Sequence, residues 1–175
     1  IKKYVNQFGD LAPFIRPANL ATDTASSIDA VIHSINYCKK KKLKFDDVIL
    51  LEPTSPLRDN SDIDNSYKYF KKNYSKYESL ISICECENSH PNFLFTFKNK
   101  KVTPYFKKFK IIRRQNLKKL FFIDGNIYIS KIEKILKSKN FVNKSTLGYQ
   151  MSKFKSFEID DYEDNVLFYE DGGDE

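Results

Sequence analysis

The sequence predicts an α/β fold of the Rossmann-like kind, with a mostly parallel sheet flanked by helices. Helix-like and strand-like segments alternate between residues 26 and 84. The strand-like runs are continuously apolar, which is typical of strands buried on both faces. Strand–helix–strand connections in one sheet give parallel pairs with right-handed crossovers. A chain of 175 residues suits one core, so we predict a single domain over residues 1–175.

The first half of the chain supplies two helix–strand pairs. Apolar residues at helical spacing predict an amphipathic helix over 26–42. The apolar run 48–51 ends abruptly at a proline-rich loop, as a buried strand does. A second helix is predicted over 61–74 and a second buried strand over 79–84.

The second half is predicted to begin with a hairpin that stands off the main sheet. Segments 93–97 and 102–106 alternate between apolar and polar residues and are joined by a short polar turn. After the hairpin the sequence predicts a strand over 127–129, a helix over 131–137, a strand over 154–159 and a closing helix over 162–169.

Composition excludes several classes of protein. No apolar run approaches the roughly 20 residues that span a bilayer, and the first residues are not of signal-peptide type, so no membrane partner is expected. Three cysteines, Cys38, Cys84 and Cys86, make no disulfide framework and favour a reduced, cytoplasmic setting. Because no second Cys or His pair accompanies Cys84 and Cys86, structural zinc is not expected.

The net charge of +7 raises the question of nucleic-acid binding. Residues 98–119 hold eight Lys and two Arg with no acid, interleaved with aromatic residues, a composition that suits single-stranded nucleic acid. The alternative is a solvated arm or a dimer surface that faces acids. Residues 156–175 contain nine acids and no base, so we favour internal or intersubunit compensation and expect no nucleic-acid partner.

Three loops at the carboxyl ends of predicted strands carry polar residues with a candidate chemical role, and Arg16 is a further candidate. The loops are Glu52–Arg58, Asp124–Asn126 and Glu158–Asp160. Glu158 and Asp160 flank Ile159, and on the predicted strand both carboxylates share one face, where they are suited to Mg²⁺. A simple acidic strand end is the alternative. Arg16 precedes a hydroxyl-rich helix start, where charge and backbone N–H groups suit a phosphate or nucleotide, although a surface arginine fits as well.

Four segments in one order give these residues a context. They are Arg16–Ser27 (RPANLATDTASS), Leu51–Arg58 (LEPTSPLR), Asp124–Ile129 (DGNIYI) and Glu158–Asp160. Together they resemble the acylneuraminate cytidylyltransferases (CMP-sialic acid synthetases) and the related enzymes for legionaminic or pseudaminic acid, over nearly the whole chain. The first two segments are specific in combination, whereas the last two are weak alone.

The resemblance implies a nucleotidyltransferase that acts on CTP. In such enzymes the anomeric hydroxyl of a nonulosonic acid attacks the α-phosphate of CTP and pyrophosphate leaves, with Mg²⁺ as cofactor. They are usually homodimers, and the region at about 92–120 is implied to be a dimerisation and substrate arm. The implied catalytic residues are Arg16, Arg114 and Asp160, and the implied nucleotide-binding residues are Arg16, Asp23 and Ser27. The residues implied to bind the sugar are Glu52, Ser55, Arg114, Gln115, Asp124 and Gly125. The implied metal ligands are Glu158 and Asp160.

Departures from the family pattern refine the expectation. Glu52 and Asp124 replace a frequent glutamine and asparagine, and Asn92 follows His90–Pro91 where sialic acid enzymes tend to have lysine, which points to a nonulosonate other than N-acetylneuraminate. Glu158 replaces an aspartate. No segment matches the family's phosphate-binding loop (A-R-x-G-S-K), so we expect an N-terminally truncated chain that is inactive by itself.

Two alternatives remain open at this point. A CMP-Kdo type of cytidylyltransferase shares the fold and the chemistry. A non-catalytic dimerising or basic nucleic-acid-binding module would need neither the acidic pair nor the Pro-Thr-Ser-Pro loop.

Overall fold

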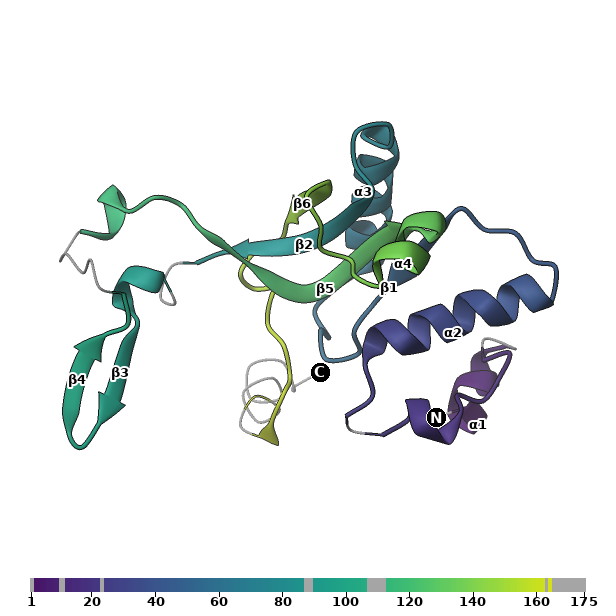
Figure 1. The fold of residues 1–175 in the computed structure, drawn as a ribbon, viewed down its shortest axis with the longest axis horizontal. Coiled ribbons are helices and arrows are strands. Elements are labelled where there is room, and N and C mark those ends of the chain that lie inside the picture. The colour runs from purple at the N-terminus through teal and green to yellow at the C-terminus, as the bar shows by residue number, and fades with distance from the viewer. Residues whose placement is uncertain are drawn as a thin grey trace, which may run out of the picture. The chain divides into compact units, whose positions relative to one another are not determined.

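The computed structural model describes residues 2–9, 12–22, 24–86, 90–106, 113–162 and 164 (Figure 1). The chain divides into two compact units. The first comprises Ile1–Val48 and Ser130–Phe141, and the second comprises Ile49–Ile129 and Val142–Glu175. No helix within the described ranges is both long and apolar enough to cross a membrane.

The first unit is helical. It contains α1 (Lys2–Val5), α2 (Ser27–Lys40) and α4 (Ile132–Ser138), with short 3-10 turns at Asn6–Phe8 and Ala18–Leu20. The Ser26 side chain caps α2 by accepting a hydrogen bond from the Ile28 N–H, and Val31 and Ile35 are buried. The helix predicted over 26–42 is therefore confirmed.

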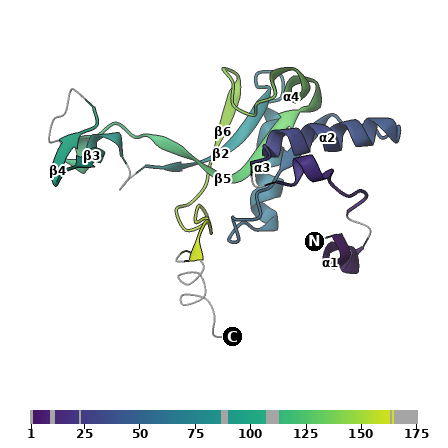
Figure 2. The ribbon, with the colours of Figure 1, turned by 60° about the horizontal axis from the view of Figure 1, so that its bottom comes forward.

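The main sheet has four strands in the order β1-β5-β2-β6 (Figures 1 and 2). The strands are β1 (Asp47–Leu50), β2 (Ser79–Glu85), β5 (Phe121–Lys131) and β6 (Thr146–Gln150). β2 and β6 are parallel, with Ser79 opposite Thr146. In contrast, the Cys86 N–H donates to the Leu120 carbonyl at 2.8 Å, so β5 starts where β2 ends and runs antiparallel to it.

The sheet is thus mixed, whereas the sequence predicts a mostly parallel one. The physical reason lies in the hairpin region between β2 and β5. That excursion returns the chain to the edge of the sheet at which β2 ends, and the next strand then runs back without a crossover helix.

The core of the second unit forms where α3 (Asn60–Lys72) covers the sheet. Its fully buried members are Phe70 of α3, Leu80 of β2, and Ile127 and Ile129 of β5. Asp59 caps α3 in a reciprocal capping box with Asp62. The apolar strands and the second helix thus occur where the sequence predicts them.

The predicted hairpin is confirmed as a separate two-stranded sheet. β3 (Phe95–Lys98) pairs antiparallel with β4 (Lys101–Pro104), and Phe97 lies opposite Val102. Asn99 and Lys100 both have positive φ, the conformation that two-residue hairpin turns require. Short 3-10 turns lie on either side, at Pro91–Phe93 and Arg114–Asn116.

The strand predicted over 154–159 is wrong. Residues 151–160 form turns and irregular backbone, and the strand that joins the sheet is β6. β6 lacks an apolar run because Gly148 lies beneath Ile83, whose Cδ1 would be 2.8 Å from an added Cβ. The closing helix predicted over 162–169 falls almost entirely outside the described residues.

Candidate active site

A buried carboxylate on β5 organises the candidate site. Asp124 is 0% exposed, and its Oδ1 accepts hydrogen bonds from the Ser82 hydroxyl and from the Asn126 N–H, the latter at 3.2 Å. Its Oδ2 accepts from the Ser156 hydroxyl at 2.8 Å. Ser82 in turn accepts from the Ile127 N–H at 2.8 Å. Protein donors therefore hold both oxygens of Asp124, which fixes the backbone of β5 at residues 124–127.

Gly125, within this stretch of β5, lies directly against the carboxylate of Glu158. Its φ of 72° lies in the left-handed region, and a Cβ at this position would be 1.6 Å from Glu158 Oε1. Burial raises the pKa of Glu158, and the negative charges of Asp160, Asp124 and Glu52 raise it further. Three other carboxylates therefore lie close enough to Glu158 to repel it.

Arg58 connects the loop after β1 to Asn126 of β5. Its guanidinium donates to the Asn126 carbonyl at 2.7 Å and to the Glu52 carbonyl at 3.1 Å. Burial lowers the pKa of Arg58, while the charges of Asp62 and Glu52 act in the opposite direction. Arg58 thus positions the backbone of Glu52 next to the acidic cluster.

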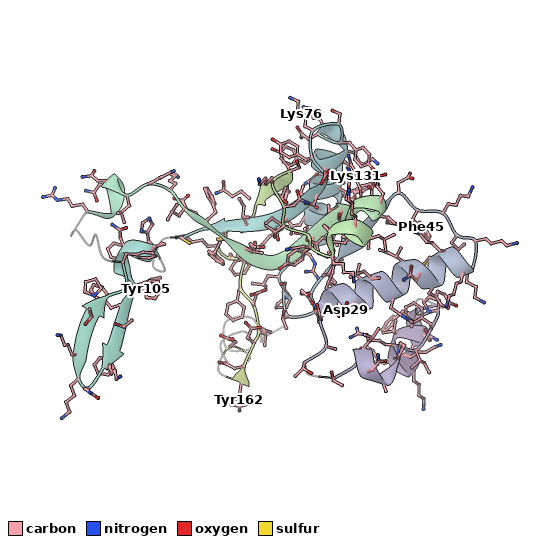
Figure 3. All side chains as sticks on the ribbon, in the orientation of Figure 1. Asp29, Phe45, Lys76, Tyr105, Lys131 and Tyr162 are labelled. Carbon is pink, nitrogen blue, oxygen red and sulfur yellow. The ribbon has the colours of Figure 1, made fainter. Side chains whose placement is uncertain are left out.

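The segment that carries the acidic pair is held largely by side chains. Lys155 Nζ donates to Asp59 Oδ2 at 2.6 Å and to Asp62 Oδ2 at 2.7 Å, at the start of α3. The Lys155 carbonyl accepts from Asn126 Nδ2 at 3.0 Å. The segment ends at the exposed Tyr162 (Figure 3).

The Pro-Thr-Ser-Pro loop contacts the same segment. The Ile159 N–H donates to the Thr54 carbonyl at 2.8 Å. Ser55 is 2% exposed, and within the described part of the chain its Oγ has no hydrogen-bond partner. A buried hydroxyl without a partner is costly, and a bound ligand or water that supplies one would relieve that cost.

Tyr128 adjoins the cluster from β5. Burial raises the pKa of its phenol, and the charges of Glu158, Glu52 and Asp124 add to the effect in that order. The tyrosine therefore stays neutral and keeps its hydroxyl proton at physiological pH.

The structure brings together five of the residues that the sequence singles out, and Ser55 lies in the adjoining loop. The five are Glu52, Asp124, Gly125, Glu158 and Asp160. Gln115 lies elsewhere in the second unit, in a cleft of about 280 Å³ with Glu85, Cys86, His90, Leu117, Lys118 and Lys119. Arg114 begins the short turn beside it, and its side chain is outside the described residues.

The predicted nucleotide-binding residues belong to the first unit. Arg16 is exposed and donates to the Leu20 carbonyl at 3.3 Å. Ser27 is the exposed first residue of α2. Asp23 lies outside the described residues.

The family resemblance implies Mg²⁺, an ion that prefers carboxylate and other oxygen ligands. Among the described residues there is no group of three or more His, Cys, Asp or Glu side chains that could hold a metal ion. Glu158 and Asp160 nevertheless fit a shared cation, because both are oxygen donors and the charge of Asp160 raises the pKa of Glu158. Mg²⁺ commonly binds one or two protein carboxylates, with water and substrate phosphates as its other ligands.

Sequence reasoning missed the residues that support the acidic pair: Ser82, Tyr128, Lys155 and Ser156. The motif Leu51–Arg58 includes Arg58 and could have pointed to it as a site residue. The motif does not show that Arg58 donates hydrogen bonds to two backbone carbonyls. Nothing local marks Lys155, since its partner Asp59 is 96 residues away.

Known proteins resemble this chain over most of its length. An N-acylneuraminate cytidylyltransferase of Streptococcus agalactiae serotype III is 30% identical over 153 residues, which is 87% of this chain and 35% of that protein. A CMP-N,N'-diacetyllegionaminic acid synthase of Legionella pneumophila is 28% identical over 162 residues, 88% of this chain and 66% of that protein. A pseudaminic acid cytidylyltransferase of Campylobacter jejuni is 30% identical over 122 residues, 70% of this chain and 52% of that protein.

The chain therefore spans about a third to two thirds of the length of these relatives. No protein-family model matches it. The relatives differ in the nonulosonic acid that their names specify, but each name specifies a cytidylyltransferase or a CMP-sugar synthase. Over most of its length the chain belongs to the acylneuraminate and nonulosonic acid cytidylyltransferase family.

Proposed function

We propose that this chain contributes the sugar-side and metal-side residues of a centre that transfers CMP from CTP to a nonulosonic acid. The observation that carries the proposal is the placement of the Glu158 carboxylate against Gly125 of β5, beside Asp160. This geometry needs a residue without a side chain at position 125 and a carboxylate at position 158. The similarity to three cytidylyltransferases or CMP-sugar synthases supports the same chemistry.

In this proposal the side chains position substrates and neutralise charge. Glu158 and Asp160 hold Mg²⁺, which when bound supplies positive charge to the phosphates of CTP. Glu52, Ser55, Asp124 and Gly125 form or support the sugar pocket, together with Arg114 and Gln115. Arg16, Asp23 and Ser27 bind the nucleotide. Reactions of this type gain mainly from fixed geometry and preorganised charge, so no covalent nucleophile is required.

The charge of the cluster bears on the choice of sugar acid. Glu52, Asp124, Glu158 and Asp160 are close enough to interact, and Glu52 and Asp124 are additional acids relative to the family pattern. A nonulosonic acid carries its own carboxylate, so this pocket favours a sugar with hydrogen-bond donors directed at Glu52. We therefore propose a legionaminic or pseudaminic type of substrate in preference to N-acetylneuraminate.

The hairpin is proposed as the dimerisation arm. Phe97 is 74% exposed and Val102 58% exposed across the β3–β4 ladder, and Tyr105 follows at 63% (Figure 3). Exposed apolar side chains clustered in this way are typical of protein–protein interfaces. Light scattering on the full chain is expected to give twice the monomer mass, and a monomer at micromolar concentration would contradict this arm.

Pyrophosphate release tests the proposed activity. The chain is extended at its N-terminus with the phosphate-binding loop of a relative and incubated with CTP, Mg²⁺ and a panel of nonulosonic acids. Release is expected with at least one of them and is expected to fall by two or more orders of magnitude in Asp160→Ala, about the range for loss of an electrostatic catalytic group. If no sugar acid supports release, the proposed function is wrong.

A further inference from the structure

Lys155 makes two ion pairs from the acidic segment, yet it lies outside the four sequence segments that carry the family resemblance. Its ammonium contacts two carboxylates, Asp59 Oδ2 at 2.6 Å and Asp62 Oδ2 at 2.7 Å. Both carboxylates belong to the capping box of α3, in which each already accepts a backbone N–H. Lys155 therefore attaches the segment to a rigid helix end.

Bonds on either side of Lys155 transmit this attachment to the acidic pair. The carbonyl of Lys155 accepts from Asn126, and the neighbouring Ser156 donates to Asp124. Glu158 follows two residues later, with its carboxylate against Gly125. Only two residues separate Lys155 from Glu158, and residues 155–158 contact β5 at residues 124–126.

The segment depends on the ion pairs of Lys155 because its backbone is not paired in a β-sheet. Residues 151–160 do not form a β-strand, and a single backbone hydrogen bond, from Ile159 to Thr54, is described for residues 157–159. The like charges of Asp160, Asp124 and Glu52 also push against Glu158. Without a fixed anchor the segment would move away from β5 to relieve that repulsion.

We propose that Lys155 is a positioning residue that holds Glu158 and Asp160 in the geometry for a divalent cation, through its ion pairs with Asp59 and Asp62. This inference rests on the proposed function, because it takes Glu158 and Asp160 as the cation ligands. Lys155 itself contacts neither substrate nor metal.

The sign of the effect separates positioning from simple electrostatics. Lys155→Met removes a positive charge from the acidic segment, and by Coulomb's law alone this would strengthen cation binding. If Lys155 acts by position, the same substitution weakens cation binding instead. Loss of a supporting group around a metal site typically lowers affinity by roughly 10-fold to 100-fold.

The test uses Mn²⁺ as the probe, with free Mn²⁺ measured by electron paramagnetic resonance during titration of the full chain. Lys155→Met is expected to weaken Mn²⁺ binding by roughly 10-fold. Lys155→Arg, which can still contact both carboxylates, is expected to retain most of the affinity. Lys134→Met is the matched control, since it removes a lysine from an exposed ion pair with Glu133 in the other unit and is expected to leave Mn²⁺ affinity unchanged.

A second variant keeps the test decisive if Lys155→Met fails to fold. Asp59→Ser removes one of the two carboxylates that Lys155 contacts but retains a good helix cap, because the serine hydroxyl can also accept the Asp62 N–H. Because Asp59→Ser also removes a negative charge, it is compared with Asp64→Ser, which removes an exposed carboxylate of α3 outside the capping box. Asp59→Ser is expected to bind Mn²⁺ less tightly than Asp64→Ser and more tightly than Lys155→Met. Far-ultraviolet circular dichroism and the unfolding midpoint establish that each variant is folded at the titration temperature.

The outcomes distinguish this inference from the proposed function. Unchanged or tighter Mn²⁺ binding in Lys155→Met and Asp59→Ser overturns the positioning role, while the metal ligands stand if Glu158→Gln abolishes binding. If Glu158→Gln binds Mn²⁺ as well as the wild type does, or if the wild type does not bind it, the metal assignment fails and the positioning role fails with it.

Discussion

At the scale of single residues, Gly125 is the position at which backbone conformation and site chemistry meet. Its positive φ excludes most side chains, and the space that a Cβ would occupy is already filled by the Glu158 carboxylate. A substitution here therefore has two separable effects, one on the backbone and one on the position of the carboxylate.

Gly125→Ala is expected to lower the free energy of unfolding by roughly 1 kcal/mol, the usual strain of alanine in the left-handed region. The steric contact adds little to that cost, because Glu158 Oε1 is the end of a flexible side chain and can swing away. Urea unfolding measures the stability and Mn²⁺ titration measures the site, where a large loss of affinity is expected. The double variant Gly125→Ala with Glu158→Ala should show the same backbone cost, and a much smaller cost would mean that the clash dominates.

At the scale of elements, Arg58 links the loop after β1 to strand β5 by hydrogen bonds to the Glu52 and Asn126 carbonyls. Arg58→Met is expected to lower the free energy of unfolding by about 2 kcal/mol, because it removes two charged hydrogen bonds and leaves the Asn126 and Glu52 carbonyls without that donor. Arg58→Lys is expected to lie in between, since an ammonium lacks the planar fork that serves both carbonyls. A Met variant as stable as the wild type in urea would show that solvent replaces both bonds.

At the scale of the whole molecule, the loss of stability in acid should depend on the ion pairs that Lys155 makes with Asp59 and Asp62. Hydrogen bonds from Lys155, then from Ser61 and the Asp62 N–H, hold the pKa of Asp59 well below its ordinary value. Because the folded-state pKa is the lower one, ionised Asp59 stabilises the fold at neutral pH, and that contribution is lost as the pH falls below about 4. The stability difference between the wild type and Lys155→Met should be largest near neutrality and shrink on acidification, as measured by urea unfolding across pH. A difference that grows in acid would contradict this assignment.

Across the molecule, the sequence predicted what depends on local pattern. Helix α2, helix α3, the strands β1 and β2 and the hairpin all follow from apolar spacing and turn residues. Of the two strands predicted to be buried, β2 is buried, whereas β1 lies at the edge of the sheet and is only half-buried. β6 was missed because Gly148 makes room for Ile83, so its fit depends on a neighbouring strand and not on its own residues. The strand over 154–159 was wrong: its apolar residues, Phe154, Phe157 and Ile159, do not alternate regularly, and the backbone there forms turns and irregular structure. The acidic pair Glu158 and Asp160 stays a prediction, because its spacing argument assumed that strand. The residues that hold the segment are distant in the chain, and no local pattern shows them.

The attachment of the acidic segment by side chains and not by a ladder has a consequence for how such a site changes over generations. A segment in a sheet can lose or gain a residue only by shifting its register, which turns every side chain to the opposite face. Residues 157–160, beyond the bonds of Met151, Lys155 and Ser156, belong to no strand and carry no such register constraint. Insertions, deletions and substitutions there can alter the reach of Glu158 and Asp160 while β2, β5 and β6 keep their pairing. If the proposed function holds, selection for a different substrate can therefore act on this segment without destabilising the sheet beneath it.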